Sequence, residues 1–168
     1  LLGLGFSVAL TTIHLALWRA PVASGTVIAL RCALVALLAT VGIGLLLGGF
    51  FGWGWRLPVV TVAHLHVAWG LIGWTVLLVA GVAYQVIPMF QITPPYPVRF
   101  VRGFAPLMAA LLVVWSVFAL GGLETAMELA GVAVAVSVAL FALTTLHLLA
   151  RRRRKIGHRR DRFRRGAP

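Results

Sequence analysis

Cysteine and acidic side chains are nearly absent from this chain, which has one cysteine and three aspartate or glutamate residues among its 168. Because Cys32 is alone, the chain can form neither an internal disulfide nor a metal site built from several cysteines. Charged residues of either sign are also scarce, at 11%, whereas 61% of the residues are hydrophobic and the mean hydropathy is +1.02. This composition excludes a soluble domain and indicates an integral membrane protein.

Long apolar runs predict an all-α, polytopic transmembrane helix bundle. A helix that crosses a bilayer needs about 20 mainly apolar residues. Five runs fit, at about 1–18, 24–51, 59–88, 103–121 and 125–150, and short connectors rich in Gly and Pro separate them. We therefore expect one transmembrane domain over 1–150 and a basic tail over 151–168. Since the first residues already read as the interior of a span, we expect a portion of a longer protein.

The formal net charge of +12 is concentrated at one end of the chain, because ten of the fifteen basic residues lie in "RRRRKIGHRRDRFRRGAP". A basic run directly after an apolar helix is typical of a cytoplasmic stop signal that also contacts anionic membrane lipid. No folded reader domain accompanies this tail, so we do not expect nucleic-acid binding.

Basic residues also predict the orientation of the spans. Arg19 follows the first span, Arg99 and Arg102 follow the third, and the basic tail follows the fifth, whereas Glu124 lies at the opposite face. The positive-inside rule then places the C-terminal tail in the cytoplasm and makes the third span run inward. We expect a multi-pass protein of the bacterial inner (cytoplasmic) membrane. Arg56 is the exception, a single basic residue on the outer side.

Two histidines one residue apart, His64 and His66, interrupt the third span, "TVAHLHVAWGLIGWTVLLVAGVAYQVIPMF". Successive helix residues are separated by about 100°, so these two side chains point roughly 200° apart with a rise of only about 3 Å. They cannot bind one metal from the same face of a regular helix. We expect them to address two different neighbours at nearly the same membrane depth.

Ionisable residues inside a span are functional candidates, and neutral imidazole is a common ligand of haem iron and of copper. The alternative is that each histidine only hydrogen-bonds a neighbouring helix. The nearby Gly70, Gly73 and Gly81 admit either a flat macrocycle or another helix close to the backbone.

Two further positions in this span carry open alternatives. Trp69 could pack on a porphyrin or on another helix. Tyr84 lies about 30 Å from His64 along the helix, so we expect an interfacial anchor there, with a proton path as the alternative.

"VAHLHV" followed by "GVAYQVIPMF" resembles the tenth helix of subunit I of the haem-copper oxidases, such as cytochrome c oxidase. The resemblance covers roughly residues 59–90 and is only topological elsewhere. It implies that His64 is the axial ligand of a high-spin haem and His66 an axial ligand of a low-spin haem. The five spans would correspond to helices eight to twelve, so the partners would be the missing N-terminal helices or other oxidase-like subunits.

Several features depart from that family. Its copper-site residues belong to helices that this chain lacks, so copper is expected only in a full-length parent. The arginine pair that contacts the haem propionates is missing from "GGLETAMEL"; Arg56 lies on the proper side to substitute, or serves as an interfacial anchor. The spacing from His64 to Pro88 is about two residues longer.

Together these observations favour a haem-binding membrane protein of redox or respiratory type. If the parent is catalytic, it would be an oxidoreductase, either a terminal oxidase or similar to a nitric-oxide reductase. One alternative is a non-catalytic haem- or copper-binding membrane protein of the nitric-oxide-response type. The other is a permease or scaffold without metal.

Overall fold

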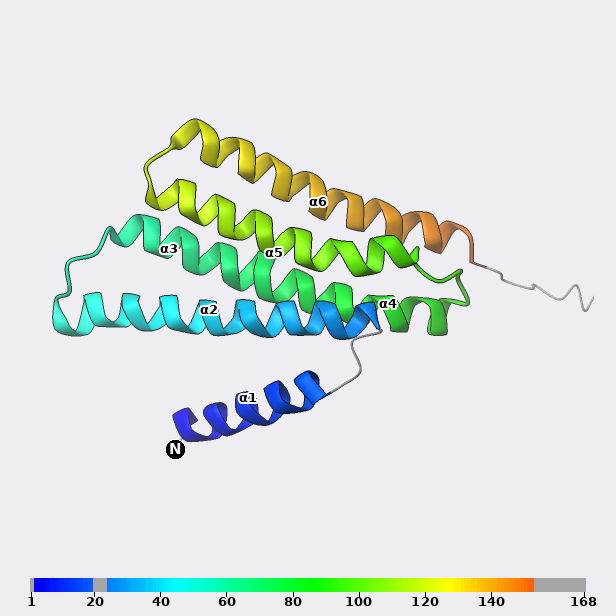
Figure 1. Ribbon diagram of the computed structural model, residues 1–168, viewed down its shortest axis with the longest axis horizontal. Helices are drawn as coiled ribbons and strands as arrows, with labels where there is room; N and C mark the ends of the chain where they lie inside the picture. Colours follow the sequence, from blue (N-terminus) through cyan, green and yellow to red (C-terminus); the bar gives the residue numbers. More distant parts are fainter. Residues whose placement is uncertain (1, 20–23, 153–168) are drawn as a thin grey trace, which may run out of the picture.

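The computed structural model describes residues 2–19 and 24–152, and these ranges are helical without a strand. Long uninterrupted helices are expected in a bilayer, where every backbone polar group must find its partner within the protein. Figure 1 shows the elements in chain order. They are α1 (Leu2–Arg19), α2 (Gly25–Trp53), α3 (Val59–Ala68), the π-helical segment η1 (Trp69–Val76), α4 (Leu77–Gln91), α5 (Val98–Leu120) and α6 (Glu124–Ala150).

Four helices of the described part are long and apolar enough to cross a membrane. They are α2, the continuous rod Val59–Gln91 formed by α3, η1 and α4, and the helices α5 and α6. The predicted span 1–18 forms α1, which is not one of these four. The chain is thus an all-helical, multi-pass membrane protein, and the remainder of the predicted tail, 153–168, lies outside the described residues.

The predicted boundaries hold within about three residues except at α5. That helix begins at Val98, after Pro97, and not at 103 as predicted from hydropathy. A proline disfavours helical backbone in the residue before it, so the helix does not extend back past Pro97. Arg99 and Arg102 occupy the first turns, where long basic side chains can extend toward water.

Small residues bring α2 close to the rod Val59–Gln91. A Cβ atom added to Gly73 would lie 2.9 Å from Cβ of Ala36, and one added to Gly81 would lie 3.2 Å from Cβ of Ala29. Gly70 likewise faces Thr40 of α2, at 3.3 Å from its methyl group. These glycines therefore serve helix packing, the second of the two alternatives offered by the sequence.

Buried residues concentrate in the half of the bundle that contains α4 and the start of α5. Tyr84 is only 8% exposed and makes edge contacts with the rings of Tyr96 and Phe141. It is a core residue, so the prediction of an interfacial anchor is wrong for Tyr84. Elsewhere the helices expose many large apolar side chains, such as Leu45 and Leu129, which suits a surface covered by lipid.

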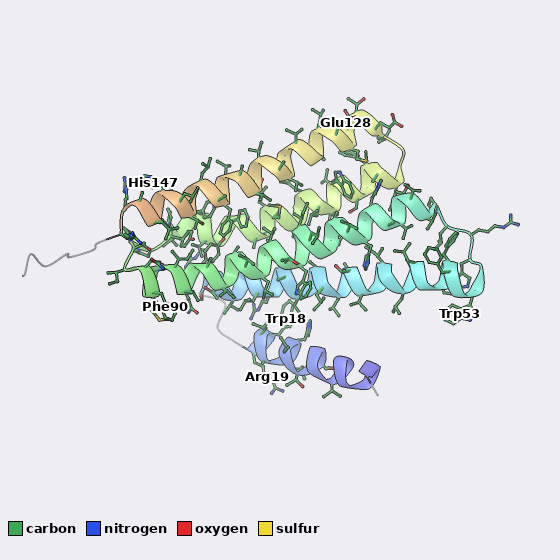
Figure 2. All side chains as sticks on the ribbon, turned by 180° about the vertical axis from the view of Figure 1, so that it is seen from behind. Trp18, Arg19, Trp53, Phe90, Glu128 and His147 are labelled. Atoms are coloured by element: carbon green, nitrogen blue, oxygen red, sulfur yellow. The ribbon has the colours of Figure 1, made fainter. Side chains whose placement is uncertain are left out.

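The two ends of the bundle differ in charge. One end, called the basic end here, carries Arg99 and Arg102 at the start of α5 and Arg151 and Arg152 after α6. The other, called the acidic end, carries Glu124 and Glu128. Figure 2 shows Glu128 and Trp53 on different helices toward one end of the bundle, and Phe90 and His147 at the other.

Helix α1 lies beside α2, apart from the other helices (Figure 1). Arg31 of α2 donates hydrogen bonds to the carbonyl oxygen of Leu17, at 3.0 Å from Nε and 2.8 Å from an Nη atom, and to that of Trp18 at 3.3 Å. Its guanidinium carbon is 5.0 Å from the centre of the Trp18 ring. A cation at a helix C-terminus pairs with unsatisfied carbonyls and with the helix dipole, so Arg31 holds the end of α1.

Candidate haem-ligating site at the histidine pair

The helix that carries the histidines changes its winding immediately after them. Residues Trp69–Val76 form a π-helix, and the Thr75 hydroxyl donates to the carbonyl of Gly70, five residues earlier, at 2.9 Å. Such segments are rare and frequently lie at functional sites. The sequence pattern alone gave no sign of this segment, because its residues are as apolar as those of the α-helices around it.

His66 faces α2 through one ring nitrogen. Its Nδ1 lies 3.0 Å from the main-chain oxygen of Thr40. A carbonyl oxygen only accepts hydrogen bonds, so Nδ1 is the donor in this bond. Space for the ring comes from Gly44, where an added Cβ would lie 3.0 Å from Cε1 of the imidazole.

His64 faces the other side of the rod. It is exposed at the rim of a cavity of about 270 Å³ at the acidic end. This cavity lies between α3, α5 and α6, and the side chains around His64 include Trp115 and Phe118 from α5 and Glu124 from the first turn of α6. An imidazole, a carboxylate and two aromatic rings therefore meet in one space.

The two histidines thus address different neighbours, as the helix geometry predicts. His66 meets α2, and His64 meets the cavity beside α5 and α6. Sequence reasoning did not identify the partners. Thr40 acts through its main-chain carbonyl, which carries no side-chain signal, whereas Glu124 could have been noticed as an acidic residue at the same face as the start of α3.

The other two predicted cofactor contacts have different surroundings. The indole nitrogen of Trp69 donates to the hydroxyl of Ser116 on α5 at 3.0 Å, and that hydroxyl donates to the carbonyl of Leu112 at 2.6 Å. This bond chain favours the helix-packing alternative for Trp69. Arg56 is exposed in the loop between α2 and α3, at the acidic end, and its role toward a haem propionate stays a prediction.

Within residues 2–19 and 24–152, no three His, Cys, Asp or Glu side chains converge in a way that suits a metal ion. Each histidine of the pair would therefore contribute a single protein nitrogen from this part of the chain.

No family model, curated protein or solved structure matches this chain. Any functional conclusion therefore depends on the residues themselves and on their arrangement.

Proposed function

We propose that this chain belongs to a haem-binding integral membrane protein of redox type, in which His64 and His66 are axial ligands of two separate haem irons. The observation that carries the proposal is the placement of two imidazoles on opposite sides of one membrane-spanning helix, about 3 Å apart in depth. In this arrangement His64 and His66 would each hold a separate haem, at nearly the same membrane depth.

The bonding of His66 supports this role. A histidine that ligates a metal almost always donates its other ring N–H to a carboxylate, a main-chain carbonyl or a water, which fixes the tautomer and the ring plane. The bond from Nδ1 of His66 to the Thr40 carbonyl has this form and leaves Nε2 for the iron. Gly44 keeps the space that this ring orientation needs.

The surroundings of His64 suit a macrocycle edge. Trp115 and Phe118 add apolar surface to the cavity beside His64, and Glu124 lines the same cavity. When bound, haem would supply the one-electron chemistry. The protein side chains would set the ring orientation, the exposure to water and the proton position on each imidazole.

The resemblance to oxidase subunit I agrees with two of these features. A helix that bridges two haems needs histidines on opposite faces. The π segment also takes up one residue of the longer spacing between His64 and Pro88, because a π turn contains an additional residue. By the same resemblance, copper would require residues of a full-length parent, the tail would be cytoplasmic in a bacterial inner membrane, and an oxidoreductase activity would depend on the parent.

Optical spectroscopy of the intact protein tests the proposal. The full-length protein in detergent is compared with its His64→Ala and His66→Ala variants by reduced-minus-oxidised difference spectra and by haem content. We expect each variant to lose a different spectral component. His147→Ala is the matched control, because His147 is an exposed histidine near the basic end and its loss should leave the spectrum unchanged.

The outcomes separate the alternatives. Absence of a Soret band in the folded protein would refute haem binding and favour the metal-free permease or scaffold. A haem spectrum that neither substitution alters would refute the assignment of His64 and His66. Haem binding without turnover of oxygen or nitric oxide would favour the nitric-oxide-response type.

A further inference from the structure

A second cavity, of about 330 Å³, opens at the basic end, far from the histidine pair along the rod. It lies where the start of α2, the last turns of α4 and the start of α5 meet. Unlike the surrounding apolar surface, its wall is rich in hydrogen-bonding groups. These come from Ser24, Thr26, Tyr84, Gln85, Tyr96 and Arg102.

Two helix N-termini converge on this cavity. Helix α2 begins at Gly25 and α5 at Val98, and they approach so closely that a Cβ atom on Gly25 would overlap Val101. Neither helix has an acidic residue in its first turn, and the Ser24 hydroxyl does not cap α2. The first backbone N–H groups of both helices therefore lack side-chain acceptors, and both helix dipoles favour negative charge here.

An independent observation comes from Tyr84. The side chain lines the cavity and is 8% exposed, and its hydroxyl is buried without a hydrogen-bond partner in the described part of the chain. Buried hydroxyls are normally paired, so a donor left unpaired beside a cavity points to an acceptor that enters from that cavity. The neighbouring Tyr96 differs, because its hydroxyl is bonded to Thr145 at 2.9 Å.

Charge identifies the class of ligand. Arg102 adds a cation at the cavity, and none of the lining residues in the described part of the chain is a carboxylate. Converging N–H groups, hydroxyls and a guanidinium are the donors that bind phosphate oxygens at helix N-termini. We propose that this cavity binds a phosphate group, carried either by the headgroup of an anionic phospholipid or by a small soluble phosphate.

The test measures ligand-dependent stabilisation of the full chain in neutral detergent. Thermal unfolding midpoints are recorded while dioleoylphosphatidylglycerol is titrated into the micelles, with dioleoylphosphatidylcholine as the zwitterionic comparison and inorganic phosphate in a separate arm. We expect saturable stabilisation by phosphatidylglycerol or by phosphate. Saturation by the lipid alone assigns the source to the membrane, and saturation by inorganic phosphate assigns it to a soluble anion.

Variants locate the effect. Arg102→Gln should weaken the apparent affinity about tenfold, and Tyr84→Phe about fivefold, as expected for a charged and a neutral hydrogen bond. Arg99→Gln is the matched control, because it removes the same charge from the same helix at an exposed position that does not line the cavity, and it should change affinity less than about twofold. If Arg102→Gln does not fold, Arg102→Lys replaces it as the test of the guanidinium.

The proposal is overturned by equal stabilisation from phosphatidylcholine, or by no stabilisation from either phosphate source. It is also overturned if Arg99→Gln weakens binding as much as Arg102→Gln, because binding would then reflect surface charge alone. Loss of affinity in Tyr84→Phe with retention in Arg99→Gln supports the cavity itself as the site.

Discussion

Replacement of Gly73 by alanine tests whether close approach of α2 and the histidine-bearing rod stabilises the bundle. Gly73 is buried in the π segment. A Cβ atom there would lie 2.9 Å from Cβ of Ala36, 3.2 Å from a methyl of Leu112 and 3.3 Å from the ring of Trp69. Carbon atoms normally pack at about 3.5 to 4.0 Å, so three neighbours on two other helices and on η1 would all have to move.

The expected magnitude follows from two opposing effects. Overpacking a close-packed interior by one methyl group typically costs about 1 to 3 kcal/mol. Alanine is intrinsically about 1 kcal/mol better than glycine in a helix. Gly73→Ala should therefore change the free energy of unfolding by about 0 to 2 kcal/mol toward instability, whereas Gly48→Ala, with no atom within 4 Å of the added Cβ, should gain up to about 1 kcal/mol.

The difference between these two variants isolates packing, because the gain in helix propensity is common to both. We expect Gly73→Ala to be less stable than Gly48→Ala by about 1 to 3 kcal/mol, measured by reversible unfolding in mixed micelles. The same variant should perturb the haem spectrum if His66 is a ligand, since α2 also carries the Thr40 carbonyl. Equal stability of the two alanine variants would refute the packing argument.

Two further perturbations address the basic end and α1. Tyr96→Phe should lower the free energy of unfolding by about 1 kcal/mol, because it removes the hydrogen bond from Tyr96 to Thr145. Thr145 donates to the carbonyl of Phe141, so its hydroxyl accepts from Tyr96. Burial raises the pKa of Tyr96. The unfolded chain loses the Tyr96 hydroxyl proton near pH 10, and the folded chain loses it at higher pH. The contribution of this group to stability is therefore complete below about pH 10 and is lost as the pH rises through the folded pKa. In unfolding titrations, Tyr96→Phe should show a smaller loss of stability at alkaline pH than the unsubstituted chain. Arg31→Gln should release the C-terminal end of α1 from α2. We expect faster amide hydrogen exchange in the last turn of α1, whereas exchange in α2 to α6 should not change. Unchanged exchange at Trp18 would contradict the capping role of Arg31.

The sequence predicts the membrane helices well because span length depends on one physical quantity, the apolar length needed to cross a bilayer. The second predicted span, 24–51, corresponds to Gly25–Trp53, and the fifth, 125–150, to Glu124–Ala150. The start of α5 was misplaced because Arg99 and Arg102 lower the local hydropathy, although helical hydrogen bonding continues through them. The π-helical winding of Trp69–Val76 is harder still to predict from the sequence, because π and α turns contain the same apolar residues.

At the candidate site, the opposite orientation of His64 and His66 follows from helix geometry alone. Their partners do not, because the Thr40 carbonyl and the Glu124 side chain are brought near by the packing of helices distant in sequence. The Tyr84 cavity was missed for the same reason. It combines residues from 24 to 102 that meet only when two helix N-termini converge.

The π segment also fixes the rotational register between the two ends of the rod. The π turn takes up about one additional residue, so an uninterrupted α-helix made of the same residues would turn every following side chain by about 100°. Deleting one residue between Trp69 and Val76 would therefore allow the segment to rewind as an α-helix, with Tyr84 still directed toward its cavity and His66 against α2. The relative direction of the two candidate sites is consequently set by eight residues that contribute no ligand to either.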